Sequence, residues 1–335
     1  MKLSVGILAR NEEKHIRKTI GSLLEQSVFS AEHEHIDTEI VVIPNGCQDD
    51  TTRFAKRALK KHQTNLEVDY TWKVSEIAIG SRTAAWNHFV HRASSRGSDF
   101  LVLVDADIEM HDPHTLFNLV HGLSEQQDAT ICMSEAIKWH HVSSRPKSTL
   151  MERLSRPSAF SSLYCARSKF LRSFWLPLGL PEEDGFIWQA AISDNFSAAP
   201  NPRRVIAAPG AQHFLEGATS FRKVLHHESQ TLMGMTVNDY LSGHLSQIAR
   251  NQAVGEWIRQ RNEEDPQWVV SFVRSSIKGR RFPIHLRWLF RRAGNLKFHS
   301  LRRGLRRMPL HLAALPFEAL ILMAANRKIS TGLGR

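Results

Sequence analysis

The sequence is poor in cysteine and has no long apolar run. Its 335 residues include three cysteines, Cys47, Cys132 and Cys165, which are far apart in the chain and odd in number. This spacing matches neither a zinc site nor a disulfide framework, so a reducing cytoplasm is the expected compartment. No stretch of about 20 apolar residues is present, so the sequence offers no clear transmembrane helix. A chain of this length can bury a large core without covalent or metal staples.

Two common phosphate-binding signatures are also missing. No Gly-x-Gly-x-x-Gly follows the first predicted strand, and no Gly-x-x-x-x-Gly-Lys-[Ser/Thr] occurs anywhere in the chain. The first absence excludes a dinucleotide-binding oxidoreductase, and the second excludes a P-loop nucleotide hydrolase. The sequence has no internal repeat and no low-complexity segment either.

Acidic residues are absent from one long stretch of the chain. The formal net charge is +11, and no Asp or Glu occurs between Asp265 and Glu318. That interval holds Arg274, Lys278, Arg280, Arg281, Arg287, Arg291, Arg292, Lys297, Arg302, Arg303, Arg306 and Arg307. The rest of the chain is close to neutral, so the basic character belongs to this segment and predicts an anionic surface as its partner.

The C-terminal segment allows two interpretations. Residues 278–307 mix cations with aromatic and aliphatic side chains, and Pro309–Ala325 is mostly apolar. The segment either anchors the protein at an anionic membrane surface or packs on the protein itself or on a second subunit. Pro316 and Glu318 argue against a membrane-spanning helix. We expect a cytoplasmic protein, peripheral to the inner face of the membrane in the first case. No nucleic-acid module accompanies the basic run, so we predict no nucleic-acid binding.

The first half of the chain predicts an α/β domain. Short β-branched apolar runs alternate with amphipathic stretches, which is typical of a mostly parallel sheet flanked by helices. We expect strands at Leu3–Leu8, Glu39–Ile43, Leu66–Val74, Phe100–Val104, Ala129–Ile137, Ser161–Ala166 and Arg204–Ala208. Helices are expected around Ile16–Leu24, Phe54–Leu59, Thr83–Ala93, Pro113–Leu123 and Glu183–Ile192, and from Thr219 onward. Residues 1–245 would form the catalytic domain, and 246–335 a helical, basic C-terminal extension.

Polar residues follow three of the predicted strands. They are Arg10–Glu12, Asn45–Gly46 and Asp105–Asp107. In doubly wound folds, ligands bind beyond the carboxyl ends of the strands, so we expect these segments to meet. Asp105 and Asp107 can hold a hard divalent cation such as Mg²⁺ or Mn²⁺, which shares its ligand shell with substrate phosphates. The alternative is that the two aspartates cap the turn or the helix that follows.

Four segments together resemble the family 2 glycosyltransferases of the GT-A fold. They are Ser4–Glu13, Glu39–Thr51, Val104–Asp107 and Leu180–Gly185, and they occur in the family's order. The resemblance implies a Rossmann-like GT-A domain that transfers a hexose, with inversion, from a nucleotide-diphosphate donor. A UDP-sugar is the expected donor, and the acceptor would be a hydroxyl of a glycan or of a lipid-linked molecule. The implied cofactor is Mn²⁺ or Mg²⁺.

The resemblance also implies roles for individual donor-side residues. Ala9, Arg10, Asn11 and Glu12 would line the base and ribose, while Arg82 and Asn87 would contact the donor. Asn45 stands where many members carry an aspartate that pairs with uracil, and this departure leaves the base open. Asp105 would bridge metal and ribose, Asp107 would bind the metal, and His213, expected in a loop, would be a third ligand. The alternatives are a solvated helix start for Arg82 and a structural role for His213.

The acidic run Glu182–Asp184 supplies the acceptor-side candidates. By the resemblance, Asp184 is the general base that deprotonates the acceptor hydroxyl, with Glu183 as its rival. Like charges nearby raise one carboxyl pKa toward the working pH, which suits a base. The alternative is that the run merely stabilises a helix N-terminus. A retaining transferase, in which Asp184 positions the acceptor, and a non-catalytic scaffold that binds nucleotide sugars or glycans also stay open.

Overall fold

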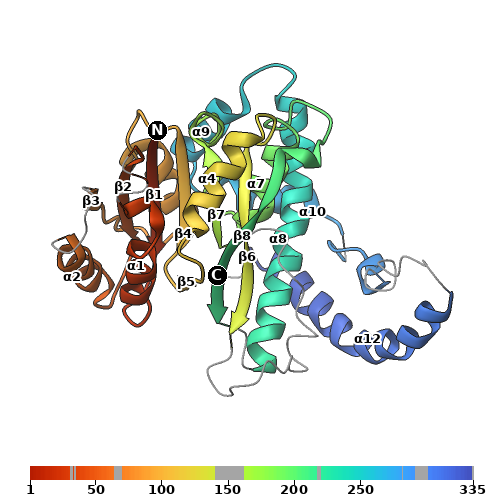
Figure 1. Cartoon of the computed structure of the whole chain (residues 1–335). Helices are drawn as coiled ribbons and strands as arrows, with labels where there is room; N and C mark the ends of the chain where they lie inside the picture. The colour runs from red at the N-terminus through yellow and green to blue at the C-terminus, as the bar shows by residue number, and fades with distance from the viewer. Residues whose placement is uncertain are drawn as a thin grey trace.

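The fold is an eight-stranded mixed sheet covered by helices on both faces (Figure 1). The computed structural model describes residues 1–30, 33, 35–63, 70–139, 162–216, 220–280, 282–290 and 301–333. In spatial order the strands are β3 (Thr71–Val74), β2 (Asp37–Pro44), β1 (Lys2–Ala9), β4 (Phe100–Asp105), β7 (Leu163–Arg167), β6 (Ile131–Trp139), β8 (Val205–Glu216) and β5 (Ile108–Met110). The predicted α/β sheet flanked by helices is confirmed.

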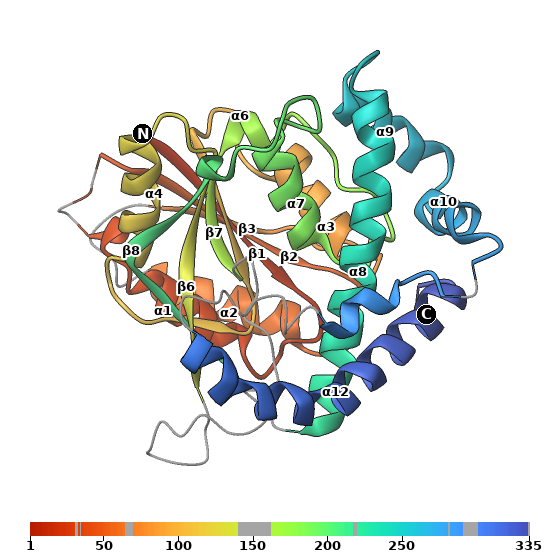
Figure 2. The same ribbon diagram turned by 90° about the vertical axis from the view of Figure 1, so that its right-hand side faces the viewer.

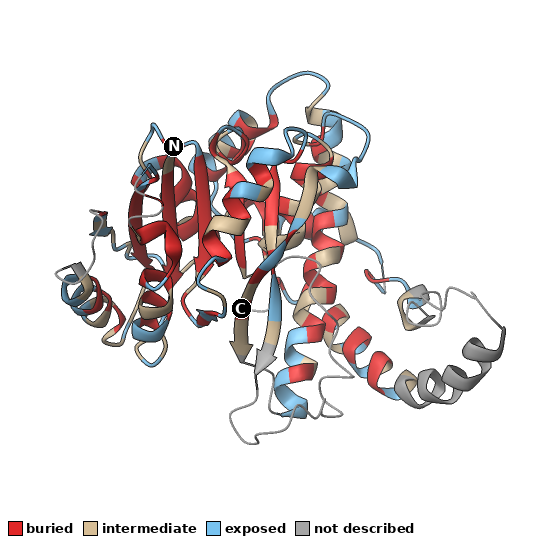
Figure 3. Cartoon of the chain, in the orientation of Figure 1, coloured by how far each residue is buried: buried red, intermediate tan, exposed pale blue. Residues whose placement is uncertain are grey.

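The helices divide between the two faces of the sheet, each over its own hydrophobic core (Figure 2). One face is covered by α1 (Ile16–Leu24), α2 (Thr51–Gln63) and α4 (Thr115–Glu125). The other is covered by α3 (Arg82–His88), α6 (Ser168–Leu171), α7 (Glu183–Ile192) and α8 (Phe221–Ile248). Helices α9 (Val254–Glu264), α10 (Trp268–Ile277) and α12 (Leu301–Ser330) lie farther from the sheet and contribute to the same core. Figure 3 shows that the central strands are buried almost throughout, which explains their continuous apolar runs.

The parallel part of the sheet brings three polar segments to one edge. Strands β2, β1 and β4 are neighbours and parallel, and their register pairs Ala9 with Pro44 and Leu8 with Asp105. The residues that follow these strands therefore emerge side by side, as the sequence predicts. Beyond β4 the sheet changes direction, because β7 runs antiparallel to both β4 and β6.

A glycine in β1 lets the helix before β4 lie close to the sheet. The helix predicted over Thr83–Ala93 is α3 followed by a π-helical turn, η3 (Phe89–Ala93). The Phe89 ring lies over Gly6, where a Cβ atom would come within 2.6 Å of the ring. Glycine at this position therefore fixes how deeply α3 and its N-terminal Arg82 approach the strand ends.

The predicted loop around His213 is wrong, because His213 lies inside β8. Pro209 and Gly210 suggest a turn, but they lie in a β-bulge at which the register with β6 shifts. Gly210 has φ +76°, a value that glycine adopts without strain. The strand therefore continues to Glu216, and His213 pairs with Met110 on one side and Ala136 on the other.

The end of α12 packs on α8. Phe317, Ile321 and Ala325 are buried in the same core as Val237 of α8. The Lys328 ammonium donates hydrogen bonds to Ser229 Oγ and Gln230 Oε1, both at 2.9 Å. For these residues the packing interpretation of the C-terminal segment holds, and α8 runs through the domain boundary predicted at residue 245.

Much of the basic segment is not described at the level of side chains, including 291–314. Its membrane-surface role and the peripheral location stay predictions. Among the residues that the structure describes, no helix has both the length and the apolar character that crossing a membrane requires.

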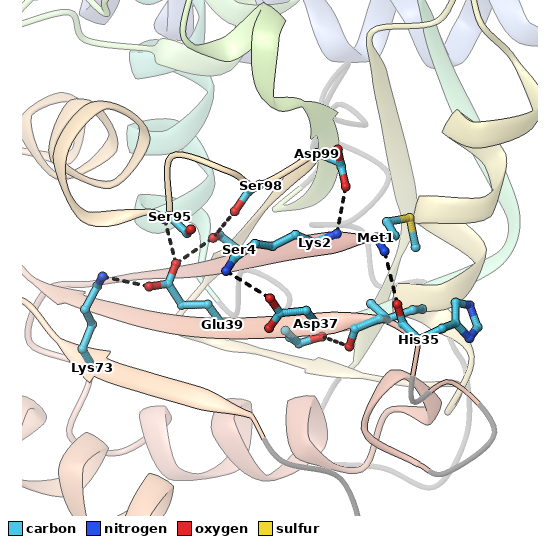
Figure 4. Close-up of polar contacts among 12 residues, drawn as sticks. Met1, Lys2, Ser4, His35, Asp37, Glu39, Lys73, Ser95, Ser98 and Asp99 are labelled. Carbon is cyan, nitrogen blue, oxygen red and sulfur yellow. Dashed lines mark hydrogen bonds and ion pairs between the residues drawn. The ribbon is translucent and has the colours of Figure 1, made fainter.

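A buried carboxylate holds together the edge of the sheet where β1 and β2 begin (Figure 4). Glu39 accepts hydrogen bonds from Ser4 Oγ at 2.7 Å, from the Ser95 backbone N–H at 2.8 Å and from Lys73 Nζ at 2.8 Å. Ser98 Oγ lies 2.7 Å from Ser4 Oγ. Burial acts to raise the pKa of Glu39, but the bonds from Lys73, Ser4 and Ser95 outweigh it and lower the pKa below its usual value.

We predict that Glu39→Gln destabilises the protein in a pH-dependent way. The lowered pKa means that the stabilisation is present above the ordinary carboxyl pKa and is lost as the pH falls through the folded-state value. Hydrogen bonds to charged groups contribute about 1.5–3 kcal/mol, so denaturant unfolding at pH 7 should show a loss of that size. The difference from the parent should narrow as the pH falls below about 4. The exposed Glu25→Gln serves as control, and a pH-independent difference would contradict the assignment.

Candidate functional site

An arginine joins two acidic segments at the carboxyl edge of the sheet. Arg82 is the first residue of α3, and Ser81 caps that helix by accepting a hydrogen bond from the Ala84 N–H. Arg82 Nη2 lies 2.6 Å from Asp105 Oδ1 at the end of β4, and Arg82 Nε contacts Glu183 Oε1 in the first turn of α7. Three elements thus converge on a recess whose lining includes Arg82, Trp86, Asp105, Tyr164, Glu183 and Asp184.

The charge of Arg82 is held firmly in this recess. Burial acts to lower its pKa, but the carboxylates of Asp105 and Glu183, with that of Asp184, raise the pKa well above its usual range. The Asp105 and Glu183 side chains are 17% and 13% exposed, whereas 46% of the Arg82 side chain is open to solvent. The arginine therefore compensates enclosed carboxylates while its own surface can still meet an incoming anion.

Asp184 and Glu183 are neighbours in different electrostatic settings. Burial, and then the adjacent Glu183 charge, raise the pKa of Asp184 well above its usual value, while Arg82 opposes this rise. Glu183 is paired directly with Arg82. The raised pKa of Asp184 is the property required of a proton acceptor at neutral pH.

Glu182, which sequence reasoning treated only as part of an acidic helix start, is the N-cap of α7. Both of its carboxylate oxygens accept from the Gly185 N–H at 3.0 Å, and Oε2 also accepts from Asn238 Nδ2 of α8 at 2.9 Å. A Cβ on Gly234 of α8 would lie 2.2 Å from Glu182 Cβ, so only glycine leaves room there. Burial raises the pKa of Glu182 to about 7.

Asp107 lies in an acidic environment beside Asp105. Asp107 is exposed at the surface, but the protein around it displaces part of the water that would stabilise its charge. This desolvation, followed by the charges of Asp105 and Glu12, raises the pKa of Asp107 to about 6. The Ala106 carbonyl between the two aspartates accepts from Thr19 Oγ1 of α1 at 2.8 Å, which fixes the turn. Within the described ranges, no three His, Cys, Asp or Glu side chains come close enough together to form a complete metal site.

His213 is buried with one ring nitrogen available. Its Nδ1 lies 2.8 Å from Ser134 Oγ, and Ser134 Oγ donates to the Leu163 carbonyl at 2.9 Å. The serine proton is thus directed at Leu163, so Nδ1–H donates to Ser134 and Nε2 keeps a lone pair. Burial lowers the pKa of His213 to about 4, and Asp105 is the charge that opposes this shift. Nε2 is buried and has no hydrogen-bond partner among the described residues.

The loops after β1 and β2 are bound to each other. Asn11, with φ +56°, accepts from the Gln48 N–H at 2.8 Å, and the Glu12 N–H donates to Thr51 Oγ1 at 2.7 Å. The Glu13 N–H donates to Asp49 Oδ2 at 3.1 Å. The first two segments of the sequence resemblance therefore form one structural unit.

Asn45 and Arg10 lie at the same edge of the sheet as this unit. Asn45 Nδ2 donates to the Ala9 carbonyl at 2.8 Å, which fixes the amide orientation, and Oδ1 is buried without a partner in the described structure. The Arg10 guanidinium lies against Gly80, where a Cβ would come within 2.8 Å of Nη2.

Asn87 lies apart from this arrangement. Its Oδ1 accepts from the Leu176 N–H at 2.8 Å and its Nδ2 donates to the Leu176 carbonyl at 2.9 Å. Both amide atoms are thus engaged with the backbone. The structure gives Asn87 a bracing role that its sequence context did not indicate, and its contact with a donor stays a prediction.

Comparison with known proteins places these segments in one family. Residues 4–187, more than half of the chain, match the profile of Glycosyl transferase family 2. The 4,4'-diaponeurosporenoate glycosyltransferase of Staphylococcus haemolyticus (strain JCSC1435) is 30% identical over 147 residues, which are 43% of this chain. The matched part spans 33% of the length of that relative.

Solved structures share the fold at low sequence identity. A mannosyltransferase from Pyrobaculum calidifontis, in complex with GDP-Man and Mn²⁺, matches with TM-score 0.56 and 14% identity over 98% of this chain and 86% of its own. The glucosyl-3-phosphoglycerate synthase of Mycobacterium tuberculosis, with Mn²⁺, UDP-glucose and phosphoglyceric acid, matches with TM-score 0.50 and 16% identity over 72% of this chain and 80% of its own. These likenesses confirm the predicted GT-A fold.

We predict that Glu182→Gln stabilises the protein at alkaline pH. The folded chain keeps a proton on Glu182 up to about pH 7 and the unfolded chain does not, so the parent loses stability as the pH rises from the ordinary carboxyl pKa to 7. A glutamine oxygen at the Oε2 position can accept from both Gly185 and Asn238 and has no charge to desolvate. Calorimetry should show a midpoint raised by about 2–4 °C at pH 8, with a smaller gain at pH 5. A lower midpoint at both pH values would contradict this account.

Proposed function

The chain belongs to Glycosyl transferase family 2, and on that premise we propose that it transfers a hexose, with inversion, from a nucleoside-diphosphate sugar to a hydroxyl acceptor. The observation that supports the proposal most is the Arg82 bridge between Asp105 and Glu183. A transferase needs donor-side and acceptor-side groups around one reacting carbon, and this bridge brings the two acidic segments into a single recess.

For the acceptor side we propose Asp184 as the general base. Inversion requires a carboxylate that takes the acceptor proton while the diphosphate leaves from the opposite face of the sugar. The raised pKa of Asp184 supports this role, because a carboxylate of higher basicity accepts a proton more readily. The pairing of Glu183 with Arg82 supports a positioning role for Glu183.

For the donor side we propose that the edge formed by Ala9, Arg10, Asn11, Glu12 and Asn45 binds the nucleoside. The Asn45 amide nitrogen is tied to the Ala9 carbonyl, so Oδ1 is the atom left to accept a hydrogen bond. Uracil presents an imide N–H to such an acceptor, which favours a UDP-sugar. Guanine also has a ring N–H, so a GDP-sugar belongs in the same donor screen. The exposed part of Arg82 would meet the diphosphate.

For the cofactor we propose a divalent cation shared with the donor. Asp105, Asp107 and His213 would hold Mn²⁺ or Mg²⁺, and the orphaned, unprotonated Nε2 of His213 is the observation that supports this set. Because the described side chains do not form a complete metal site, oxygens of the donor would have to complete the ligand shell. When bound, the ion supplies positive charge that neutralises the leaving diphosphate.

We predict that Asp184→Asn removes turnover and leaves donor binding in place. General-base catalysis contributes about 100-fold to 10,000-fold, and the substitution changes neither the size of the side chain nor the donor edge. The measurement is nucleoside diphosphate release in a screen of UDP-sugars and GDP-sugars with Mn²⁺, together with calorimetric titration of the nucleotide. Full activity in Asp184→Asn with loss in Glu183→Gln would make Glu183 the base. A product with retained anomeric configuration would exclude the base role altogether.

We predict that His213→Leu weakens nucleotide binding only when the divalent cation is present. UDP or GDP affinity should fall by about tenfold or more in the presence of Mn²⁺ and stay unchanged with EDTA. His33→Leu, which removes a buried histidine from a different part of the fold, is the matched control. Equal Mn²⁺-dependent affinity in His213→Leu and the parent would show that His213 is structural.

A further inference from the structure

The acid pair Glu183–Asp184 is delivered by a connector without regular structure. Helix α6 ends at Leu171 and α7 begins at Glu183, and residues 172–182 between them form neither helix nor strand. A segment of this kind is ordinarily the more mobile part of a fold. Catalytic groups, in contrast, must be held to within about 0.5 Å of their productive positions. Contacts from outside the connector therefore have to hold Glu183 and Asp184 in place.

Three asparagine side chains from three helices bind the backbone of this connector. We call Asn87 of α3, Asn238 of α8 and Asn262 of α9 the asparagine clamp. Asn87 donates to and accepts from Leu176, and Asn262 Nδ2 donates to the same Leu176 carbonyl at 2.9 Å. Asn262 Oδ1 accepts from the Leu178 N–H at 2.9 Å, and Asn238 Nδ2 donates to the Glu182 carbonyl at 3.0 Å.

The clamp is buried and is supported from behind. Asn87, Asn238 and Asn262 are 5%, 1% and 8% exposed. Trp268 Nε1 donates to Asn262 Oδ1 at 2.9 Å, so the Asn262 amide is held in one orientation. Helix α9 also touches the connector through its backbone, because a Cβ on Gly255 would lie 2.1 Å from the Ser173 carbonyl oxygen. Helix α9 is therefore in direct contact with the start of the connector.

We propose that the asparagine clamp positions Glu183 and Asp184 for catalysis, so that α9 is a working part of the catalytic unit. Asn262 lies beyond residue 245, where the sequence predicts that the catalytic domain ends. The proposal rests on the transferase function proposed above. The clamp residues act through the backbone of the connector and are positioning residues.

Asn326 offers a matched control for the clamp. Its Oδ1 accepts from the Ile284 N–H at 2.9 Å and its Nδ2 donates to the Leu322 carbonyl at 3.0 Å. It thus makes the same two kinds of backbone contact as Asn262, but it joins α12 to the segment before η5 (Leu286–Phe290). Asn262→Ala and Asn326→Ala each remove a side-chain acceptor and a side-chain donor to the backbone, and only the first removes them from the connector.

The test compares the two variants in the whole 335-residue chain, well below both unfolding midpoints. UDP-glucose and GDP-mannose with Mn²⁺ are the donor probes, followed by any better donor from the screen. We expect Asn262→Ala to lower kcat by about 10-fold to 100-fold with donor KM unchanged, and Asn326→Ala to leave kcat unchanged. If Asn262→Ala does not fold, Asn262→Asp replaces it, because it keeps the acceptor for Leu178 and Trp268 and loses the donor to Leu176. Equal kcat in the clamp variant, Asn326→Ala and the parent would overturn the proposal.

Hydrogen exchange separates failure of the clamp from failure of the proposed function. Asn262→Ala should speed amide exchange in peptides covering residues 174–185, and Asn326→Ala should not. Unchanged exchange in that region would overturn the clamp, whatever the activity. If Asn262→Ala exchanges faster there but the parent chain transfers no sugar, the clamp stays in place as an ordering device and the transferase proposal is refuted instead.

Discussion

The ion pairs of Arg82 hold together a site that its own charges would otherwise drive apart. Asp105 ends a central strand, while Glu183 and Asp184 open a helix that follows a long irregular connector. Carboxylates at close range in a partly enclosed recess repel one another strongly. Because Arg82 contacts the first two of them, the end of β4, the start of α3 and the start of α7 can share one space.

Each element around this interaction is fixed by a separate constraint. The parallel register of β1, β2 and β4 sets the donor edge. Gly6 leaves room for the Phe89 ring, and this lets α3 lie close to the sheet. Helix α7 is fixed at its first turn by Glu182, which is bound in turn by Asn238 of α8. Helix α8 therefore holds the residue that precedes Glu183 and Asp184, and it lies in the same hydrophobic core as the end of α12.

The sequence pattern predicted those elements that are determined by residues close together in the chain. The apolar runs of β1, β2 and β4, the spacing of Ile16, Ile20 and Leu23, and the aspartates after β4 all act within a few residues of themselves. The length of β8 could not be predicted, because Pro209 and Gly210 form a bulge that depends on pairing with β6. The bracing role of Asn87 was also invisible, since its partner Leu176 is 89 positions away in the sequence.

A double-mutant cycle measures whether Arg82 is coupled to Glu183, the residue through which it joins the end of β4 to the start of α7. The unfolding free energies of Arg82→Met, Glu183→Gln and the double variant are compared with that of the parent at pH 7.5. If the residues interact as described, Arg82→Met costs less in the Glu183→Gln background, with a coupling of about 0.5–3 kcal/mol. Effects that add to within about 0.3–0.5 kcal/mol would contradict the claim.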